Sequence, residues 1–186
     1  MNERYRTLLG HFRHEVGHYY WDVLLANSER LPAFRALFGD ERKDYGEALA
    51  AYYDHPPAPD SWTGDFVSDY AQAHPWEDWA ETWAHYLHMM DTLETAHSFG
   101  FSSSEKVPKV SVAQDFERLI NAWFELTVAL NGMNRSMGLP DAYPFKIGDR
   151  AKEKLAFVHE TVAAQQSASK PLAAPSPTEA PDPKAA

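Results

Sequence analysis

Cysteine is absent from this chain of 186 residues, which excludes both disulfide bonds and thiolate metal sites. Any metal ion must therefore be bound by histidine and carboxylate side chains. Apolar runs long enough to cross a bilayer are also absent. The N-terminal stretch MNERYRTLLGHFRHE lacks the charged region, the apolar run and the cleavage site of a signal peptide. We therefore expect a cytoplasmic protein with no membrane contact.

Positive charge is scarce. The chain has 17 Lys and Arg residues against 27 Asp and Glu residues, which gives a formal net charge of −10. An acidic surface repels phosphate backbones, so nucleic acid is not an expected partner. Hydrophobic residues make up 44% of the chain and aromatic residues 13%, which is enough for one domain with a core of large side chains.

Strand signals are missing, whereas apolar residues recur at helical spacing, so we predict a mainly α fold with little or no sheet. Residues 1–164 are expected to form one domain. Residues 165–186, rich in Ala, Ser and Pro, are expected to form a disordered tail. The predicted helices span 3–27, 44–54, 115–136, 148–164 and a long segment from Pro75 to about residue 99, with short helical pieces at 32–37 and 65–73.

The most informative segment is HFRHEVGHYYWD, residues 11–22, in which His14, Glu15 and His18 form an HExxH motif. On a helix, His14 and His18 share one face, so both imidazoles can reach one ion. Glu15 points about 100° away, where it can reach a water at that ion. Two ligands and a general base on one helix are typical of zinc proteases. A pair of surface histidines is the alternative interpretation.

A third ligand is expected among the acids at the start of the long helix, Glu77, Asp78 and Glu81. Carboxylates on an aromatic-flanked face are costly to bury unless positive charge lies nearby, which favours Glu77 as a metal ligand. Capping of the helix N-terminus by acids is the alternative. Asp22 lies four residues after His18 and is a candidate to hold its ring nitrogen, with an exposed helical acid as the alternative.

The chain also resembles a bacterial family of zinc-binding metallopeptidases of the gluzincin type. Within it, YAQAHPWEDWAE is similar to the zinc-ligand segments of anthrax lethal factor and of Mlc titration factor. The resemblance covers nearly everything from Tyr5 to His159, in the stretches YRTLLGHFRHEVGHYYWDVL, FRALFGDERKDYGEALAAYYDHPP, FVSDYAQAHPWEDWAETWAHYLHMMDTLETA and LTVALNGMNRSMGLPDAYPFKI with EKLAFVH.

The resemblance implies the helical portion of a zincin-like metallopeptidase domain that binds Zn²⁺ and cleaves a peptide or protein substrate. It implies that Glu77 is the third ligand and that Glu81 holds a ligand histidine. It also implies that Tyr70, seven residues before Glu77, assists catalysis. Members of this family are usually about twice as long, so we expect the cysteine-rich zinc ribbon and the sheet-bearing segment to lie outside this chain.

Two alternatives remain at this stage. Glu15–His18 and Glu94–His97 are both E-x-x-H pairs, and together with Glu47 and Glu125 they would make a di-iron carboxylate bundle. The other alternative is a helical zinc-binding or interaction module without catalytic activity.

Overall fold

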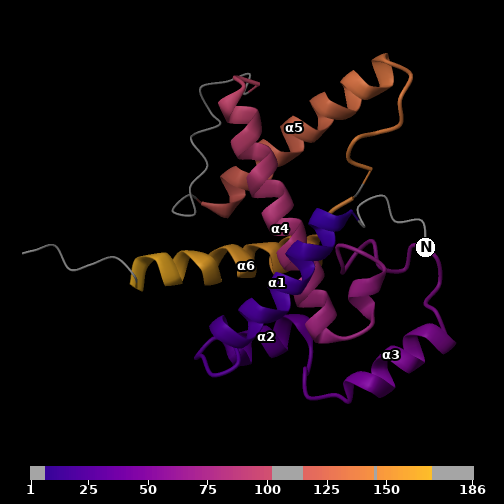
Figure 1. The fold of residues 1–186 in the computed structure, drawn as a ribbon, viewed down its shortest axis with the longest axis vertical. Coiled ribbons are helices and arrows are strands. Elements are labelled where there is room, and N and C mark those ends of the chain that lie inside the picture. Colours follow the sequence, from indigo (N-terminus) through magenta and orange to yellow (C-terminus); the bar gives the residue numbers. More distant parts are fainter. Residues whose placement is uncertain (1–6, 102–114, 145, 169–186) are drawn as a thin grey trace, which may run out of the picture.

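The computed structural model describes residues 7–101, 115–144 and 146–168 (Figure 1). In these ranges the chain forms helices and no strands, so the prediction of a mainly α fold is confirmed. None of the described helices combines the length and apolar character needed to cross a membrane. The elements are α1 (Leu8–Leu24), α2 (Leu31–Phe38), α3 (Tyr45–Asp54), a 3₁₀ turn η1 (Tyr70–Gln72), α4 (Pro75–Ser98), α5 (Phe116–Ser136) and α6 (Asp149–Ala168).

Side-chain caps explain where several helices begin. The Thr7 hydroxyl accepts a hydrogen bond from the Gly10 backbone N–H, at 3.0 Å, at the start of α1. His74 caps α4 through Nδ1, which accepts from the Trp76 N–H at 3.1 Å. Pro75 then occupies the first turn of α4, where its missing N–H costs no helical hydrogen bond. The cap and the proline fix the start of α4, so Glu77 lies in its first turn.

Helix α4 is central to the fold and packs against α1, α2, α5, α6 and the η1 turn (Figure 1). Its buried face carries Trp79, Trp83, Tyr86, Met89 and Leu93, and aromatic side chains of this size bury large apolar areas. The core is continued by residues of the other elements, which include Trp21, Leu25, Phe34, Phe38, Ile120, Trp123, Leu155 and Val158.

The structure differs from the sequence-based prediction in two segments. The predicted short helix at 65–73 is wrong, because only the η1 turn forms there. Local side chains bond this backbone instead: Ser68 Oγ accepts from the Ala71 N–H at 3.3 Å, and the Gln72 side-chain amide donates to the Asp69 carbonyl oxygen at 3.3 Å. The last helix continues to Ala168, four residues into the predicted tail. The rest of that tail, 169–186, lies outside the described residues.

Gly17 lies at a close approach between α1 and α4. A Cβ atom added at Gly17 would lie 3.0 Å from Ala80 Cα and 3.2 Å from Trp83 Cβ. The Gly17 carbonyl also accepts a hydrogen bond from Trp79 Nε1 at 2.9 Å. The glycine therefore lets the two helices that carry the HExxH motif and Glu77 lie against each other.

We expect Gly17→Ala to lower the free energy of unfolding by about 1–3 kcal/mol, because the added methyl group overpacks the contact with α4. Alanine has the better helix propensity, so propensity alone would predict the opposite sign. Gly132→Ala in α5 is the matched control, since a Cβ there would meet nothing within 4 Å. It is expected to stabilise the protein by up to about 1 kcal/mol. Urea denaturation measures both, and equal effects would contradict the close approach.

Candidate metal centre

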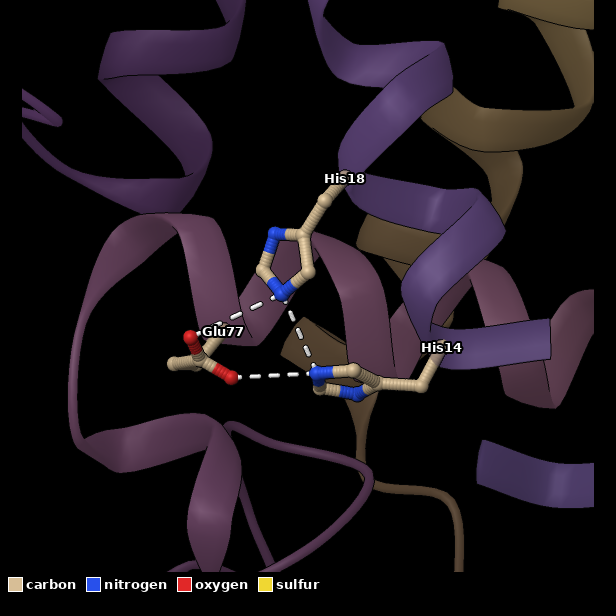
Figure 2. Close-up of side chains that lie close together, drawn as sticks. All are labelled: His14, His18 and Glu77. Carbon is tan, nitrogen blue, oxygen red and sulfur yellow. Dashed lines mark hydrogen bonds and ion pairs between the residues drawn. The ribbon is translucent and has the colours of Figure 1, made fainter. Parts of the chain in front are cut away.

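Three side chains from two helices bring their ligand atoms together (Figure 2). His14 Nε2 and His18 Nε2, both on α1, lie 3.1 Å apart. Glu77, in the first turn of α4, places Oε2 3.1 Å from His14 Nε2 and Oε1 3.6 Å from His18 Nε2. Two atoms bound to one tetrahedral zinc ion lie roughly 3.3 Å apart. The spacing of the three side chains therefore fits a shared ion.

Burial of Glu77 supports this fit. Glu77 is 1% exposed, and its buried Oε2 has His14 as its ion-pair partner. A buried carboxylate is costly unless positive charge lies beside it. The ligand atoms of His14, His18 and Glu77 all lie within 4.8 Å of one another, and no other such group is found among the described residues. The arrangement could therefore hold a metal ion.

Glu81 orients the first histidine. Its Oε1 lies 2.6 Å from His14 Nδ1, and its Oε2 accepts a hydrogen bond from the Ser68 hydroxyl at 2.6 Å. A carboxylate on one ring nitrogen fixes the tautomer and angle, so the other nitrogen, Nε2, faces the site. Ser68 in turn holds the Glu81 carboxylate, which ties the segment before η1 to α4.

Burial and neighbouring charges shift the pKa values of His14, His18 and Glu77. Burial lowers the pKa of His14, but contacts with the Glu77 and Glu81 carboxylates outweigh it and raise the value to about 9. Burial lowers the pKa of His18. Burial raises the pKa of Glu77, but the contacts with His14 and Tyr45 outweigh it and lower the pKa overall. Glu77 is therefore an anion beside two histidines, which are the residue types of a His₂Glu zinc site. In the metal-free protein a proton on His14 balances this charge, and an ion would replace that proton.

An open pocket of about 330 Å³ lies beside the His14–His18–Glu77 cluster, and all three side chains line it. Glu15 lines it beside the two histidines and has a side chain that is 58% exposed. Two tyrosines, Tyr45 and Tyr70, and Trp76 form the rest of its wall. Burial, followed by the charge of Glu77, raises the pKa of Tyr70, so its hydroxyl stays protonated at neutral pH. Burial and the hydrogen bond to Glu77 likewise raise the pKa of Tyr45 to about 12.

Asp22 is not brought to the site. It is exposed, and no hydrogen bond or ion pair joins it to His18 in the described part of the chain. The residues of the di-iron alternative join no possible metal-binding group in the described part of the chain, and four of them are exposed: Glu47, Glu94, His97 and Glu125. That alternative has no support in the described structure.

Two residues at the site have no local sequence signal. The Tyr45 hydroxyl donates a hydrogen bond to Glu77 Oε1 at 2.7 Å, and Ser68 donates to Glu81. Both reach the site through tertiary contacts between segments far apart in the chain. Helical periodicity, which located His14 and His18, carries no information about such contacts.

The described residues thus form a helical domain in which a His–His–Glu cluster, shared between two helices, could hold a metal ion. The sequence profile of one protein family, described as "Putative zinc-binding metallo-peptidase", matches residues 1–161. The match covers most of the chain, so the chain belongs to this family.

Curated proteins from two mycobacteria are similar in sequence to this chain. An uncharacterized protein of Mycobacterium tuberculosis and one of Mycobacterium bovis are each 46% identical to it over 166 residues. The matched region is 87% of this chain and 48% of each relative. The chain therefore spans about half the length of the curated relatives it matches. No solved structure gives a significant match.

Proposed function

We propose that this chain carries the catalytic zinc site of a peptide hydrolase. The observation that supports the proposal best is the His14–His18–Glu77 cluster, which joins two helices and opens into a pocket lined by Glu15. These three side chains would hold the ion. Bound zinc would supply a Lewis acid that acidifies a water and polarises a carbonyl group.

The protein's own groups then have separate roles. The Glu15 carboxylate accepts a proton from the attacking water and passes it to the nitrogen of the leaving amine. The Tyr70 hydroxyl, which stays protonated, donates a hydrogen bond to the carbonyl oxygen as negative charge develops on it. Glu81 keeps the His14 ring in place through Nδ1. Each role uses an atom that lines the pocket or contacts a ligand side chain.

The proposed substrate is a peptide or a protein. The pocket is open, as the binding of an extended chain requires, and Trp76 offers an aromatic surface at its wall. The net charge of −10 disfavours nucleic acid as a substrate or partner. Contact with a membrane forms no part of the proposal.

The experiment that tests this proposal is the zinc content of the purified chain, measured by mass spectrometry beside the double variant His14→Ala His18→Ala. We expect one zinc per chain in the wild type and none in the variant, because two of three ligands are lost. Zinc at 100 times its dissociation constant should also stabilise the wild type by about 2.7 kcal/mol. The variant should show no such increase in melting temperature.

His97→Ala is the matched control, because His97 is exposed and lies at the far end of α4. It should bind zinc as the wild type does. A wild type that takes up no zinc would contradict the proposal. One zinc per chain without hydrolysis of any peptide in a library would support the alternative of a non-catalytic zinc-binding module.

A further inference from the structure

The two oxygens of the Glu77 carboxylate have different surroundings. Oε1 accepts a hydrogen bond from the Tyr45 hydroxyl at 2.7 Å. Oε2 is buried and lies 3.1 Å from His14 Nε2. An ionised carboxylate only accepts hydrogen bonds, so each buried oxygen needs its own donor or cation. Tyr45 supplies the donor for Oε1, which lies 3.6 Å from His18 Nε2, whereas Oε2 makes the shorter contact, with His14.

The position of Tyr45 is fixed from several sides. Its ring packs edge-on against His74 at 5.3 Å and at a tilt against Trp76 at 6.1 Å, measured between ring centroids. His74 caps α4 and also lies within 3.2 Å of the Lys43 carbonyl through Nε2. Tyr45 is the first residue of α3. The hydroxyl is thus held beside the first turn of α4, where Glu77 lies.

Helix α3 has no buried residue, so hydrogen bonds contribute to holding it on the protein. Two tyrosines of α3 donate such hydrogen bonds to side chains outside the helix. Tyr45 donates to Glu77, and Tyr52 donates to Asp69 at 2.7 Å. Only the first of these two bonds reaches a ligand side chain, so the roles of the two hydroxyls can be separated by experiment.

We propose that Tyr45 is a positioning residue for the metal centre: its hydroxyl holds Glu77 Oε1 and so presents Oε2 as the single ligand oxygen to zinc. The inference rests on the proposed function. It assigns to α3 a part in metal binding that neither the HExxH motif nor the helix start at Pro75 implies.

Tyr45→Phe removes the hydroxyl and keeps the ring that packs on His74 and Trp76. Loss of a hydrogen-bonded partner outside the ligand set typically lowers metal affinity about 10- to 100-fold. We expect a loss of that size, measured by competition with a chromophoric chelator. Tyr52→Phe is the matched control on the same helix, and its zinc affinity should equal that of the wild type. Circular dichroism of the metal-free proteins checks that all three are equally folded.

Cobalt substitution gives a second readout that a general loss of stability would not change. In Tyr45→Phe both Glu77 oxygens are free to contact the ion, which raises its coordination number from four toward five. The visible absorption of the Co²⁺-loaded variant should then be weaker than that of the wild type. Tyr52→Phe should keep the wild-type spectrum.

The outcomes are distinct. Equal zinc affinity and equal cobalt spectra in wild type and Tyr45→Phe would overturn the positioning role and leave the proposed function intact. An equal loss in Tyr45→Phe and Tyr52→Phe would overturn it too, because docking of α3 would then be the cause. A wild type that binds neither zinc nor cobalt would overturn both proposals together.

Discussion

Replacing Lys154 by methionine is expected to lower the free energy of unfolding by about 3–5 kcal/mol, because it leaves a buried acid without its cation. Lys154 on α6 is 3% exposed and Asp78 on α4 is 1% exposed. Their Nζ and Oδ2 atoms lie 2.7 Å apart. Nζ also donates to the Asp65 carbonyl at 2.8 Å and lies 4.0 Å from the centre of the Phe66 ring.

Asp78 is the residue that makes this substitution costly. Burial raises the pKa of Asp78 to about 7, although the charge of Lys154 lowers it. Removing the cation therefore forces the folded protein either to keep a bare buried charge or to protonate it. Because Asp78 follows Glu77 directly, the pair also fixes the first turn of α4 at the metal centre. Urea denaturation of the metal-free proteins measures the cost.

The double variant Asp78→Asn Lys154→Met is the control for that result. It removes both charges, and replacing a whole buried ion pair is often close to neutral. We expect it to regain most of the stability that the single variant loses. A single-variant cost below about 1 kcal/mol, as for an exposed ion pair, would contradict the buried pair.

Replacing Glu15 by glutamine is expected to reduce peptide hydrolysis by about 10²- to 10⁴-fold, because the amide cannot accept the proton of the attacking water. Zinc binding should be unchanged, since Glu15 is not among the three clustered ligand side chains. Its side chain is 58% exposed and its nearest ionic contact is His11, at 3.6 Å. The measurements are turnover of a peptide substrate and zinc content of the same sample.

Glu94→Gln is the matched control for this prediction. Glu94 is exposed on α4 and lies outside the pocket lining, so its loss should leave turnover at the wild-type level. Full activity in Glu15→Gln would exclude Glu15 as the general base. Loss of zinc together with activity would instead mean that Glu15 supports the ligand set.

The helices of this fold were predictable where local signals agree. Pro75 marks the start of α4 within one residue of the structure, and prolines after Asp54 mark the end of α3. The segment 65–73 was not predictable in this way. Its apolar spacing suits a helix, but the Ser68 hydroxyl oxygen and the Gln72 side-chain amide bond backbone groups that a helix would use. The energy of that competition depends on the folded environment, which periodicity does not contain.

The residues of the candidate metal centre were not all equally predictable from the sequence. His14 and His18 follow from helical geometry alone, since a spacing of four residues places them on one face. Glu77 could be proposed because a carboxylate on an apolar face needs a cation. Tyr45 could not, because its contact with Glu77 joins two helices with no shared sequence pattern. Asp22 shows the limit of spacing arguments: it shares a helix with His18, yet it faces solvent.

The ligand set has a topological consequence for a chain without cysteine. An ion held by His18 and Glu77 would link two points about 60 residues apart and close a loop that contains α2, α3 and η1. The entropy of closing a loop grows only with the logarithm of its length. Insertions in the proline-rich connection at 55–60 would therefore change the stability of this crosslink very little. The metal centre would tolerate length variation in the segment that it encloses, provided that Tyr45 keeps its place.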